Sequence, residues 1–203
     1  MLWVVTSRLP SLDDYVAMLP DGLDSFPEAK AKASLYRSTV EHTLLDDVDL
    51  LPPELRPLIT DPVPVSSWIP EVHSHAMILV CRDVAFDSDE DFIEFTYQQQ
   101  RALFSGRLYR IMLALASPSV LFRTAAMRWK SFHRGSSFTV EHWTSTSAQI
   151  RIEHPPGLWH GVLSGALLAG LRAVLDLSGA QNTRLEIAEH AAEHMRLVGS
   201  WTV

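Results

Sequence analysis

The chain has 203 residues, 47% of them hydrophobic and 20% charged, which is a globular composition with enough length for one sizeable core. The formal net charge of −7 argues against a nucleic-acid-binding protein, because phosphate contacts need a basic surface. The single cysteine, Cys81, excludes a disulfide framework within the chain and a cysteine-rich zinc site.

The chain carries no obvious membrane or export signal. Its start, Met1–Arg8, lacks the basic region and the apolar length of a signal peptide. The most apolar segment, Gly157–Leu171, is shorter than the ~20 residues that a bilayer-spanning helix needs, and His154 and Arg172 bound it. We therefore expect a soluble, cytoplasmic protein without a membrane span.

The first two thirds of the chain are predicted to be mainly helical. Leu2–Val5 is apolar and β-branched, which indicates a short strand. Ser11 and Ser67 are expected to cap helices, and the proline-rich segment 46–65 is expected to be a structured connector. Apolar spacing predicts helices over 11–19, 27–45, 67–82, 87–105, 108–115 after a break at Gly106, and 117–134, where Ser117 is the expected cap.

Two groups of polar residues on these helices resemble functional sites but have simpler explanations. His73 and His75 diverge by about 200° on a helix, so they cannot chelate one metal together, and we expect them at the surface. The acids of Asp87–Asp91 resemble a catalytic cluster, but they suit the positive end of a helix dipole.

After Gly135 the hydrophobic period changes from helical to alternating. Hairpins are predicted over 138–153 and 184–202, with the apolar run from Gly157 forming a helix between them. Each hairpin has one apolar face and one charged face, and opposite charges on neighbouring strands are expected to pair. The sequence thus predicts an α+β fold, in which an N-terminal helical region packs on a four-stranded antiparallel sheet of strand–strand–helix–strand–strand order.

We expect a single domain over 1–203, with a mainly helical region over 1–135 and a sheet region over 136–203. In the first hairpin, His142 falls on the apolar face, either as a hydrogen-bonded core histidine or as a ligand contact. Trp143 falls among the charges of the other face, where it is an interface anchor or is covered by N-terminal residues.

Two further features bear on binding. His190 and His194 are four residues apart, as in a helical zinc pair, but they flank a turn and lack a third ligand, so no metal site is predicted. Gly157, Gly161 and Gly165 fall on one stripe of the predicted helix, and each costs about 1 kcal/mol relative to alanine. The stripe indicates close approach of the helix to the sheet, room for a ligand, or room for a partner's helix.

Three segments carry a resemblance to a known superfamily, and they span about two thirds of the chain. They are Ser67–Pro70, Phe104–Arg110 with Ser117-Pro118 after it, and Gly157-x-x-x-Gly161-x-x-x-Gly165 between the hairpins. With the order of elements, they resemble the superfamily that contains 4-vinyl reductase-type ligand-binding domains, haem–nitric-oxide-binding domains and TRAPP vesicle-tethering subunits. The chain is similar, more closely, to an uncharacterised myxobacterial family related to that superfamily.

The resemblance implies helices packed on an antiparallel sheet, a cavity between them, frequent dimerisation and no catalysis. Haem–nitric-oxide-binding domains carry Tyr-x-Ser-x-Arg, but the nearest stretch here, Tyr36–Val40, has valine in place of the arginine and lies in another region, so haem is not expected. The cysteines of 4-vinyl reductase-type domains are absent, and His160 lies near the place of one. TRAPP-type members hold an acyl chain on a cysteine, and whether Cys81 is equivalent stays open; its apolar context predicts a buried thiol.

No nucleotide-binding, nucleophile-elbow or zinc-protease motif occurs in the sequence. We predict a non-enzymatic regulatory or sensory module that binds a small apolar ligand or acyl chain in a helix–sheet cavity, without a cofactor. The alternative is a protein-interaction subunit without a ligand, as a homodimer or a TRAPP-like scaffold, with Trp143 at the interface. The predicted ligand-binding residues are Trp129, His142, Trp159, His160, Gly161, Gly165 and Cys81.

Overall fold

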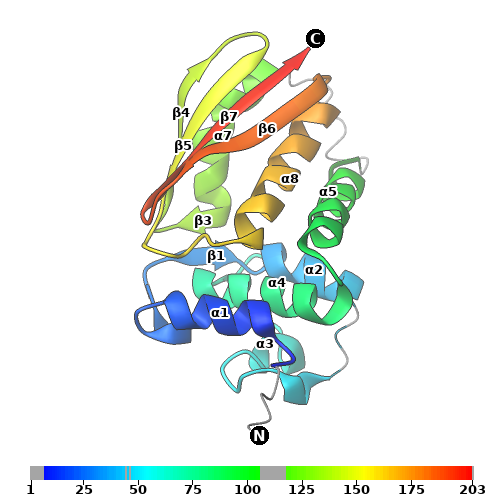
Figure 1. Cartoon of the computed structure of the whole chain (residues 1–203), viewed down its shortest axis with the longest axis vertical. Helices are drawn as coiled ribbons and strands as arrows, with labels where there is room; N and C mark the ends of the chain where they lie inside the picture. The colour runs from blue at the N-terminus through cyan, green and yellow to red at the C-terminus, as the bar shows by residue number, and fades with distance from the viewer. Residues whose placement is uncertain (1–6, 44, 46, 106–117, 203) are drawn as a thin grey trace, which may run out of the picture. The chain divides into compact units, whose positions relative to one another are not determined.

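The structure is a computed structural model that describes residues 7–43, 45, 47–105 and 118–202 (Figure 1). The chain divides into two compact units, Met1–Asp89 and Glu90–Val203. Helices and antiparallel strands make up the structure, and its four-stranded sheet is C-terminal, which confirms the predicted α+β class. The single domain, with its regions 1–135 and 136–203, stays a prediction.

The first unit is built around α4 (Glu71–Ala85), which is buried over most of its circumference and packs against α1 and α2. A helix that is covered on several sides needs apolar residues around its axis, and the run Met77–Cys81 supplies them. The remaining elements of this unit are α1 (Pro10–Met18), the short 3₁₀ turns Gly22–Asp24 and Val48–Leu50, β1 (Lys30–Lys32), α2 (Ser34–Thr43), α3 (Pro57–Thr60) and β2 (Trp68–Pro70).

Helix α1 is capped by a residue far away in sequence. Leu9 is its N-cap and makes no side-chain cap, and Pro10 occupies the first turn. The carboxylate Oδ2 of Asp83 in α4 accepts the backbone N–H groups of Ser11, at 2.9 Å, and Leu12, at 3.2 Å. A carboxylate at this position accepts two backbone N–H groups that would otherwise lack a partner, and its negative charge is stabilised by the positive end of the helix dipole. The prediction that Ser11 caps this helix is therefore wrong.

Two segments predicted as helix contain short strands instead. Ala29, Ala31 and Ala33 are buried at every second position, and the strand β1 between them pairs with β2, where Ala31 lies opposite Ile69. The helix propensity of alanine suggested a helix from Pro27, but sheet pairing determines this segment, and α2 begins only at Ser34.

The same pairing delays the next helix. Trp68–Pro70 forms β2, so α4 starts at Glu71 rather than near Ser67, and Pro70 is its N-cap. Ser67 does not cap this helix. Its carbonyl accepts the backbone N–H of Ala33 at 3.0 Å.

The second unit combines helices with the four-stranded sheet. Every neighbouring pair of strands is antiparallel, and their order in space is β4-β5-β7-β6, which confirms the predicted strand–strand–helix–strand–strand sequence. Its elements are α5 (Asp89–Ser105), α7 (Pro118–Phe132), β3 (His133–Arg134), β4 (Ser137–Trp143), β5 (Ser147–Glu153), α8 (Val162–Leu177), β6 (Gln181–His190) and β7 (His194–Thr202).

Helices α7 and α8 cover one face of this sheet, α7 over β4 and α8 over β6 (Figure 1). The core between them is aromatic. The Trp129 ring lies 5.4 Å from that of Phe138, and Phe122 stacks on Trp201 at 5.3 Å. Both pairs join α7 to the sheet, where they add to the hydrophobic stabilisation and hold this helix in place.

The outer face of the sheet is charged, as predicted. Arg196 pairs with Glu141 and Glu189, each at 3.2 Å, and Arg151 pairs with Glu153 at 3.3 Å. Of these pairs, Arg196–Glu189 joins the neighbouring strands β7 and β6, Arg196–Glu141 reaches across β5, and Arg151–Glu153 lies within β5.

A β-bulge in β4 reverses the predicted faces of His142 and Trp143. The register shifts after Val140, so that His142 lies opposite Gln149 and Trp143 opposite Ala148. Gln149 belongs to the outer face, and one extra residue in a strand turns each later side chain to the other face. The prediction that His142 lies on the apolar face is wrong, and its side chain is exposed.

Several sequence-based predictions lie outside the described residues. They concern the strand Leu2–Val5, the break at Gly106, the helical continuation over 108–115 and the cap Ser117. Over the stretches of chain that the structure describes, no helix has the length and apolar character to cross a bilayer.

Candidate functional site

The helix between the two hairpins is shorter than the sequence suggested. It begins at Val162, and Gly161 precedes it as N-cap with φ +53° and ψ −127°. Gly157 also has a positive φ, of 75°, and lies in the turn before the helix. The predicted stripe of three helical glycines is therefore wrong, because Gly157 and Gly161 serve backbone conformations that side chains disfavour.

Gly165 is the member of that stripe that lies within α8, and its role is close packing. A Cβ on Gly165 would lie 2.5 Å from Cδ1 of Ile93 in α5. The close approach is thus to another helix and not to the sheet. Further along the contact, Ala169, Ala173 and Tyr97 form a small buried cluster with Ile93 against it.

A groove of about 250 Å³ lies between α5 and α8. Its lining is predominantly apolar, and one wall comes from each helix with a contribution from β6. The lining residues are Ile93, Glu94 and Tyr97 of α5, Gly165, Leu168, Ala169 and Arg172 of α8, and Leu185 of β6. The absence of a side chain at Gly165 keeps this groove open between closely packed helices.

One rim of the groove is held by a polar network. The Tyr97 hydroxyl donates to Oδ2 of Asp176 at 2.6 Å, and Arg172 lies over the Tyr97 ring at 4.8 Å while its Nε is 3.7 Å from the same carboxylate. Burial first, and then the Asp176 carboxylate, raises the pKa of Tyr97. The phenol therefore stays protonated and acts as a fixed donor that orients the ring.

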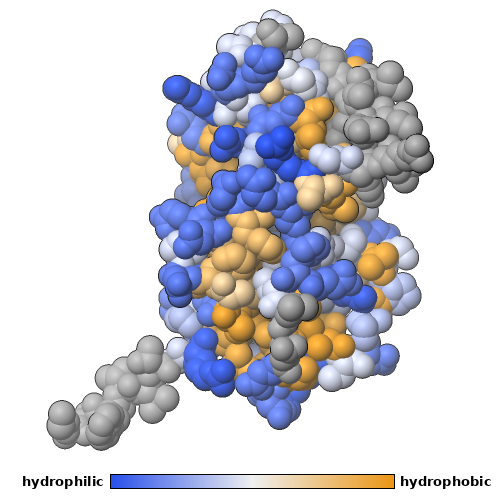
Figure 2. All heavy atoms as spheres, turned by 90° about the vertical axis from the view of Figure 1, so that its right-hand side faces the viewer, coloured by the Kyte–Doolittle hydropathy of each residue, from blue (hydrophilic) through white to orange (hydrophobic). Residues whose placement is uncertain are grey.

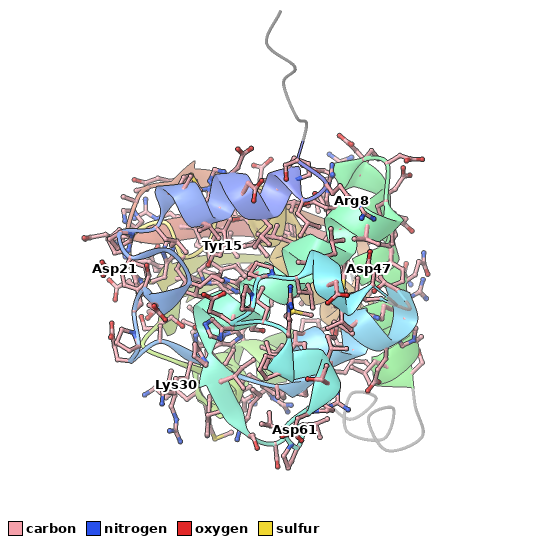
Figure 3. The ribbon with its side chains drawn as sticks, turned by 90° about the horizontal axis from the view of Figure 1, so that it is seen from below. Arg8, Tyr15, Asp21, Lys30, Asp47 and Asp61 are labelled. Carbon is pink, nitrogen blue, oxygen red and sulfur yellow. The ribbon has the colours of Figure 1, made fainter. Side chains whose placement is uncertain are left out.

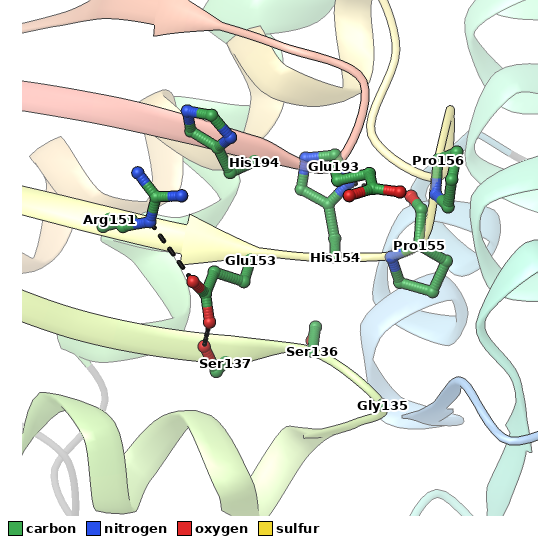
Figure 4. Close-up of a pocket in the computed structure, with 10 residues that line it drawn as sticks. All are labelled: Gly135, Ser136, Ser137, Arg151, Glu153, His154, Pro155, Pro156, Glu193 and His194. Carbon is green, nitrogen blue, oxygen red and sulfur yellow. Dashed lines mark hydrogen bonds and ion pairs between the residues drawn. The ribbon is translucent and has the colours of Figure 1, made fainter.

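A larger and more polar hollow, of about 590 Å³, lies where β4, β5 and β7 begin or end (Figure 4). Two of its charged residues pair with each other: Oε1 of Glu153 binds Arg151, and Oε2 of Glu153 accepts the Ser137 hydroxyl at 3.2 Å. His194 lies 3.3 Å from Glu189. Glu193 also lines the hollow, so charged groups of both signs surround it.

The structure brings together two of the predicted ligand-binding residues. The rings of Trp129 and Trp159 are 6.1 Å apart, His133 stacks on Trp129 at 3.9 Å, and Trp129 donates from Nε1 to Ser136 at 3.1 Å. Both tryptophans are buried and line neither hollow. They pack the core beneath β4, and a ligand role for them stays a prediction.

The other predicted ligand residues are dispersed. His142 and His160 are exposed, and a Cβ on Gly161 would meet no atom within 4 Å. Of the predicted set, Gly165 is the residue that lines the groove. The sequence signal that could have identified its neighbours is the helical face of Ile93 and Tyr97 in α5.

Cys81 lies in the other unit and is fully buried in α4, which confirms the buried thiol. Burial raises the pKa of Cys81 from 9.0 to about 11, against a smaller opposing effect of a hydrogen bond with Thr43. The thiol is therefore protonated at neutral pH and lacks the thiolate character of a reactive cysteine.

A buried cluster of ionisable groups in the first unit was missed at the sequence level. His75, predicted at the surface, is 3% exposed. Its Nδ1 lies 3.4 Å from the Tyr15 hydroxyl, and its Nε2 is 3.8 Å from Oε1 of Glu71, which is fully buried. Figure 3 shows Tyr15 on the inner side of α1. The i,i+4 spacing of Glu71 and His75 was the available signal.

Metal-binding geometry does not occur among the described residues, where no group of three or more His, Cys, Asp or Glu side chains converges. His190 points its Nε2 to the carbonyl of Trp159 at 2.9 Å, while His194 pairs with Glu189. On the face shown in Figure 2, apolar side chains form separate patches between polar ones.

Comparison with known proteins identifies the fold. No protein-family model and no curated protein matches the sequence. An unliganded Fe(II) H-NOX protein variant from K. algicida shares 12% identity, with a TM-score of 0.56 over 85% of this chain and 97% of that chain. An oxygen-binding H-NOX domain related to soluble guanylate cyclases, in its oxygen complex, shares 7% identity, with a TM-score of 0.54 over 84% and 92%.

A third structure, from work on the mechanism of H-NOX activation, gives a TM-score of 0.54 at 8% identity, over 84% of this chain and 94% of that chain. At these identities the likeness establishes the fold alone. This chain has the fold of H-NOX domains.

Proposed function

We propose that this chain is a non-enzymatic sensory or regulatory domain that binds a small apolar molecule in the groove between α5 and α8. The observation that carries the proposal is the groove itself, an opening of about 250 Å³ lined mainly by apolar side chains of two helices and a strand. Small-molecule sites are concave and mostly apolar, with a few polar groups that orient the ligand.

The groove has both kinds of group. Ile93, Leu168 and Leu185 provide apolar lining, and Glu94 and Arg172 add charged groups to it. The Tyr97–Asp176 hydrogen bond holds one wall in a fixed conformation, which reduces the entropy that a ligand loses in ordering its site. The fold adds support, because the H-NOX structures above include one described as oxygen-binding.

Haem does not fit the described residues. Haem iron needs an axial ligand such as histidine or a cysteine thiolate. The buried histidines are packed against neighbours: His75 lies against Tyr15, His133 stacks on Trp129, and Nδ1 of His154 lies 2.9 Å from the Pro155 carbonyl. The sensory role that we propose for this chain therefore does not require haem.

The segment Tyr36–Val40, which comes nearest to the Tyr-x-Ser-x-Arg motif of haem-binding domains, also argues against haem. Tyr36 is fully buried in α2 and donates its hydroxyl to the Leu58 carbonyl at 3.1 Å. Arg37 pairs with Glu41 at 3.3 Å. Neither side chain is available to bind a haem propionate. Position 40, where the motif has arginine, is valine.

We also propose that the chain catalyses no reaction, since the groove contains a protonated tyrosine and exposed charges but no nucleophile with an adjacent base. Membership of the myxobacterial family and kinship with 4-vinyl reductase-type and TRAPP proteins remain proposals that rest on the sequence resemblance. An acyl chain on Cys81 is the least favoured ligand, because that thiol is buried and protonated.

The proposal is tested by thermal unfolding with a panel of small apolar compounds that includes indole, cyclohexanol and hexanoic acid. A compound at about 100 times its Kd stabilises the folded state by about 2.7 kcal/mol, which raises Tm by several degrees. Leu168→Trp fills the groove from its edge and is expected to abolish the shift. Leu167→Trp, one position away and outside the groove, is the matched control and should retain it.

The proposal fails if no compound raises Tm in the wild-type protein, or if Leu168→Trp and Leu167→Trp bind equally well. Native mass spectrometry of the mildly purified protein provides an independent reading, because a co-purifying small molecule should be lost in the Leu168→Trp variant only.

The alternative function, a protein-interaction subunit, has one observation in its favour. Trp143 is 42% exposed at the end of β4, and tryptophan is enriched in interface anchors. If Trp143 is an interface anchor, Trp143→Ala should weaken binding of the chain to its partner and leave the thermal stability of the chain unchanged.

A further inference from the structure

Basic and acidic residues are unevenly distributed along this chain, because one long segment contains no acidic residue. Residues 95–140 contain seven of the 17 lysines and arginines and none of the 24 aspartates and glutamates. The rest of the chain therefore carries ten of these cations against all 24 acids. The net charge of −7 conceals a strongly basic segment within an acidic protein, and α7 lies in that segment.

The solvent side of α7 presents this charge without local compensation. Arg123, Met127 and Lys130 are exposed at positions i, i+4 and i+7, so they share one side of the helix, here named the α7 basic face. Neither Arg123 nor Lys130 forms an ion pair within the described residues. On the outer face of the sheet, by contrast, Arg151 and Arg196 both have carboxylate partners. Met127, at 66% exposure, adds an apolar contact.

The first turns of α5 carry the complementary charge. Glu90, Asp91 and Glu94 are all exposed there and form what we name the α5 acidic face. Helix α5 packs against α8 through Ile93 and Gly165, whereas α7 packs over β4. In Figure 1, α5 and α7 lie on opposite sides of α8. One copy of the chain therefore cannot bring its own two faces together.

We propose that the α7 basic face docks on the α5 acidic face of a second copy of this chain. Because the two faces are different patches on opposite sides of α8, the contact is heterologous and extends head to tail instead of closing as a two-fold dimer. A membrane surface fits less well. The apolar residues Leu121, Phe122 and Trp129 of α7 are already buried, so the helix has no wide apolar face left for a bilayer.

Sedimentation velocity of the full chain over a range of concentrations tests the contact. At about 0.02 M salt the protein should form a concentration-dependent series of oligomers, and about 0.5 M salt should dissociate them, because exposed charges are screened within a Debye length. Reversal of two cations, Arg123→Glu with Lys130→Glu, should weaken association at least about tenfold. The control, Arg8→Glu with Arg184→Glu, makes the same change in net charge elsewhere and should leave it unchanged.

A mixing experiment makes the test specific to these two faces. The variant Glu90→Lys with Asp91→Lys should also fail to associate alone, since its α5 and α7 faces are both basic. Mixed with the Arg123→Glu, Lys130→Glu variant it should associate again, because opposite charges then meet at every contact. Circular dichroism confirms that each variant is folded before mixing.

A wild-type protein that is monomeric at low salt up to its highest soluble concentration overturns the proposal. So does association that the α7 reversal leaves intact, or a mixture that stays monomeric. Binding of the wild-type monomer to vesicles rich in anionic lipid, lost in the α7 reversal, would assign the basic face to a membrane and would equally overturn it.

Discussion

The two units of the chain differ in where they place their carboxylate groups. The first unit places ionisable side chains inside: Glu71 and His75 are buried beside Tyr15, and the Asp83 carboxylate caps α1 from within. The second unit places the ion pairs of Arg196 on the outer face of a sheet, and its interior is mainly aromatic and aliphatic, although His133 and His154 are also buried.

This difference between the units indicates which of them is better suited to bind a ligand. Buried polar groups that bind one another are costly to rearrange, so the cluster of the first unit serves the fold. In the second unit, apolar packing leaves a groove between α5 and α8, with Gly165 in its lining. A ligand can enter such a groove without breaking a buried hydrogen-bond network.

The largest expected effect tests the aromatic interior of the second unit. Trp129→Ala should lower the free energy of unfolding by about 3–5 kcal/mol, because it removes contacts with Phe138 and Trp159 and leaves a cavity. Trp143→Ala, at an exposed position, should change it by less than about 0.5 kcal/mol. Urea denaturation measures both, and similar losses for the two variants would contradict an aromatic core beneath β4.

The same experiment examines the prediction of one domain. If the chain unfolds as a single cooperative unit, Trp129→Ala moves one transition as a whole. If the substitution splits the denaturation curve into two transitions, the prediction of a single domain is wrong.

The next effect concerns the buried thiol of the first unit. Below pH 9.0 the cysteine is protonated in both states, and between pH 9.0 and about 11 the unfolded chain loses the proton while folded Cys81 keeps it. Stability should therefore fall as pH rises through this window, by about 2–3 kcal/mol from Cys81 alone. Tyr15 and Tyr36, whose pKa values burial also raises, add to the loss at higher pH.

Chemical denaturation of wild type and Cys81→Ala at both ends of that window isolates the cysteine. The variant should lose less stability between the two pH values. Equal losses would show that the thiol is not held in its protonated form by burial.

The glycines before and within α8 separate backbone strain from packing. Gly161→Ala should cost about 1–3 kcal/mol, because its φ of +53° with ψ of −127° is unfavourable for any side chain. Gly165→Ala should change stability by less than about 1 kcal/mol, since the gain in helix propensity offsets a clash with the mobile end of Ile93. If instead both variants are stabilised, as two helical glycines would predict, α8 begins earlier than Val162.

The smallest effect tests the long-range cap in the first unit. Asp83→Ala should cost about 0.5–2 kcal/mol by removing the acceptor for the N–H groups of Ser11 and Leu12. Asp83→Asn keeps an acceptor oxygen and should cost less. Hydrogen exchange of α1 amides measures the local effect, and unchanged protection in Asp83→Ala would mean that the cap does not hold this helix.

The two units also differ in how far the sequence predicted them. In the second unit, alternation of apolar residues over 138–153 and 184–202 predicted all four strands, because one buried face imposes a period of two. The bulge after Val140 was not predictable, since no turn residue marks it, and it exchanged the faces of His142 and Trp143.

In the first unit, local propensity was a poorer guide. Strand β1 and strand β2 depend on each other across about 40 residues of chain, so neither Lys30–Lys32 nor Trp68–Pro70 signals a strand by itself. The burial of His75 depends in part on Tyr15 in another helix, so the i,i+4 spacing from Glu71 was the signal available along the chain.

The candidate groove was anticipated only through Gly165. Aromatic content predicted Trp129 and Trp159 as ligand contacts, but both pack in the core. The true lining, with Ile93 and Tyr97 of α5 facing α8, requires the helix–helix contact that spacing along the sequence does not reveal.

Methyl NMR during titration with small apolar compounds tests the central proposal most directly. A compound that binds should shift the methyl signals of Ile93, Leu168 and Leu185, which line the groove, while those of Leu12 and Leu55 in the first unit's core stay unchanged. Shifts spread over both cores, or no saturable shift with any compound of the panel, would contradict a ligand site between α5 and α8.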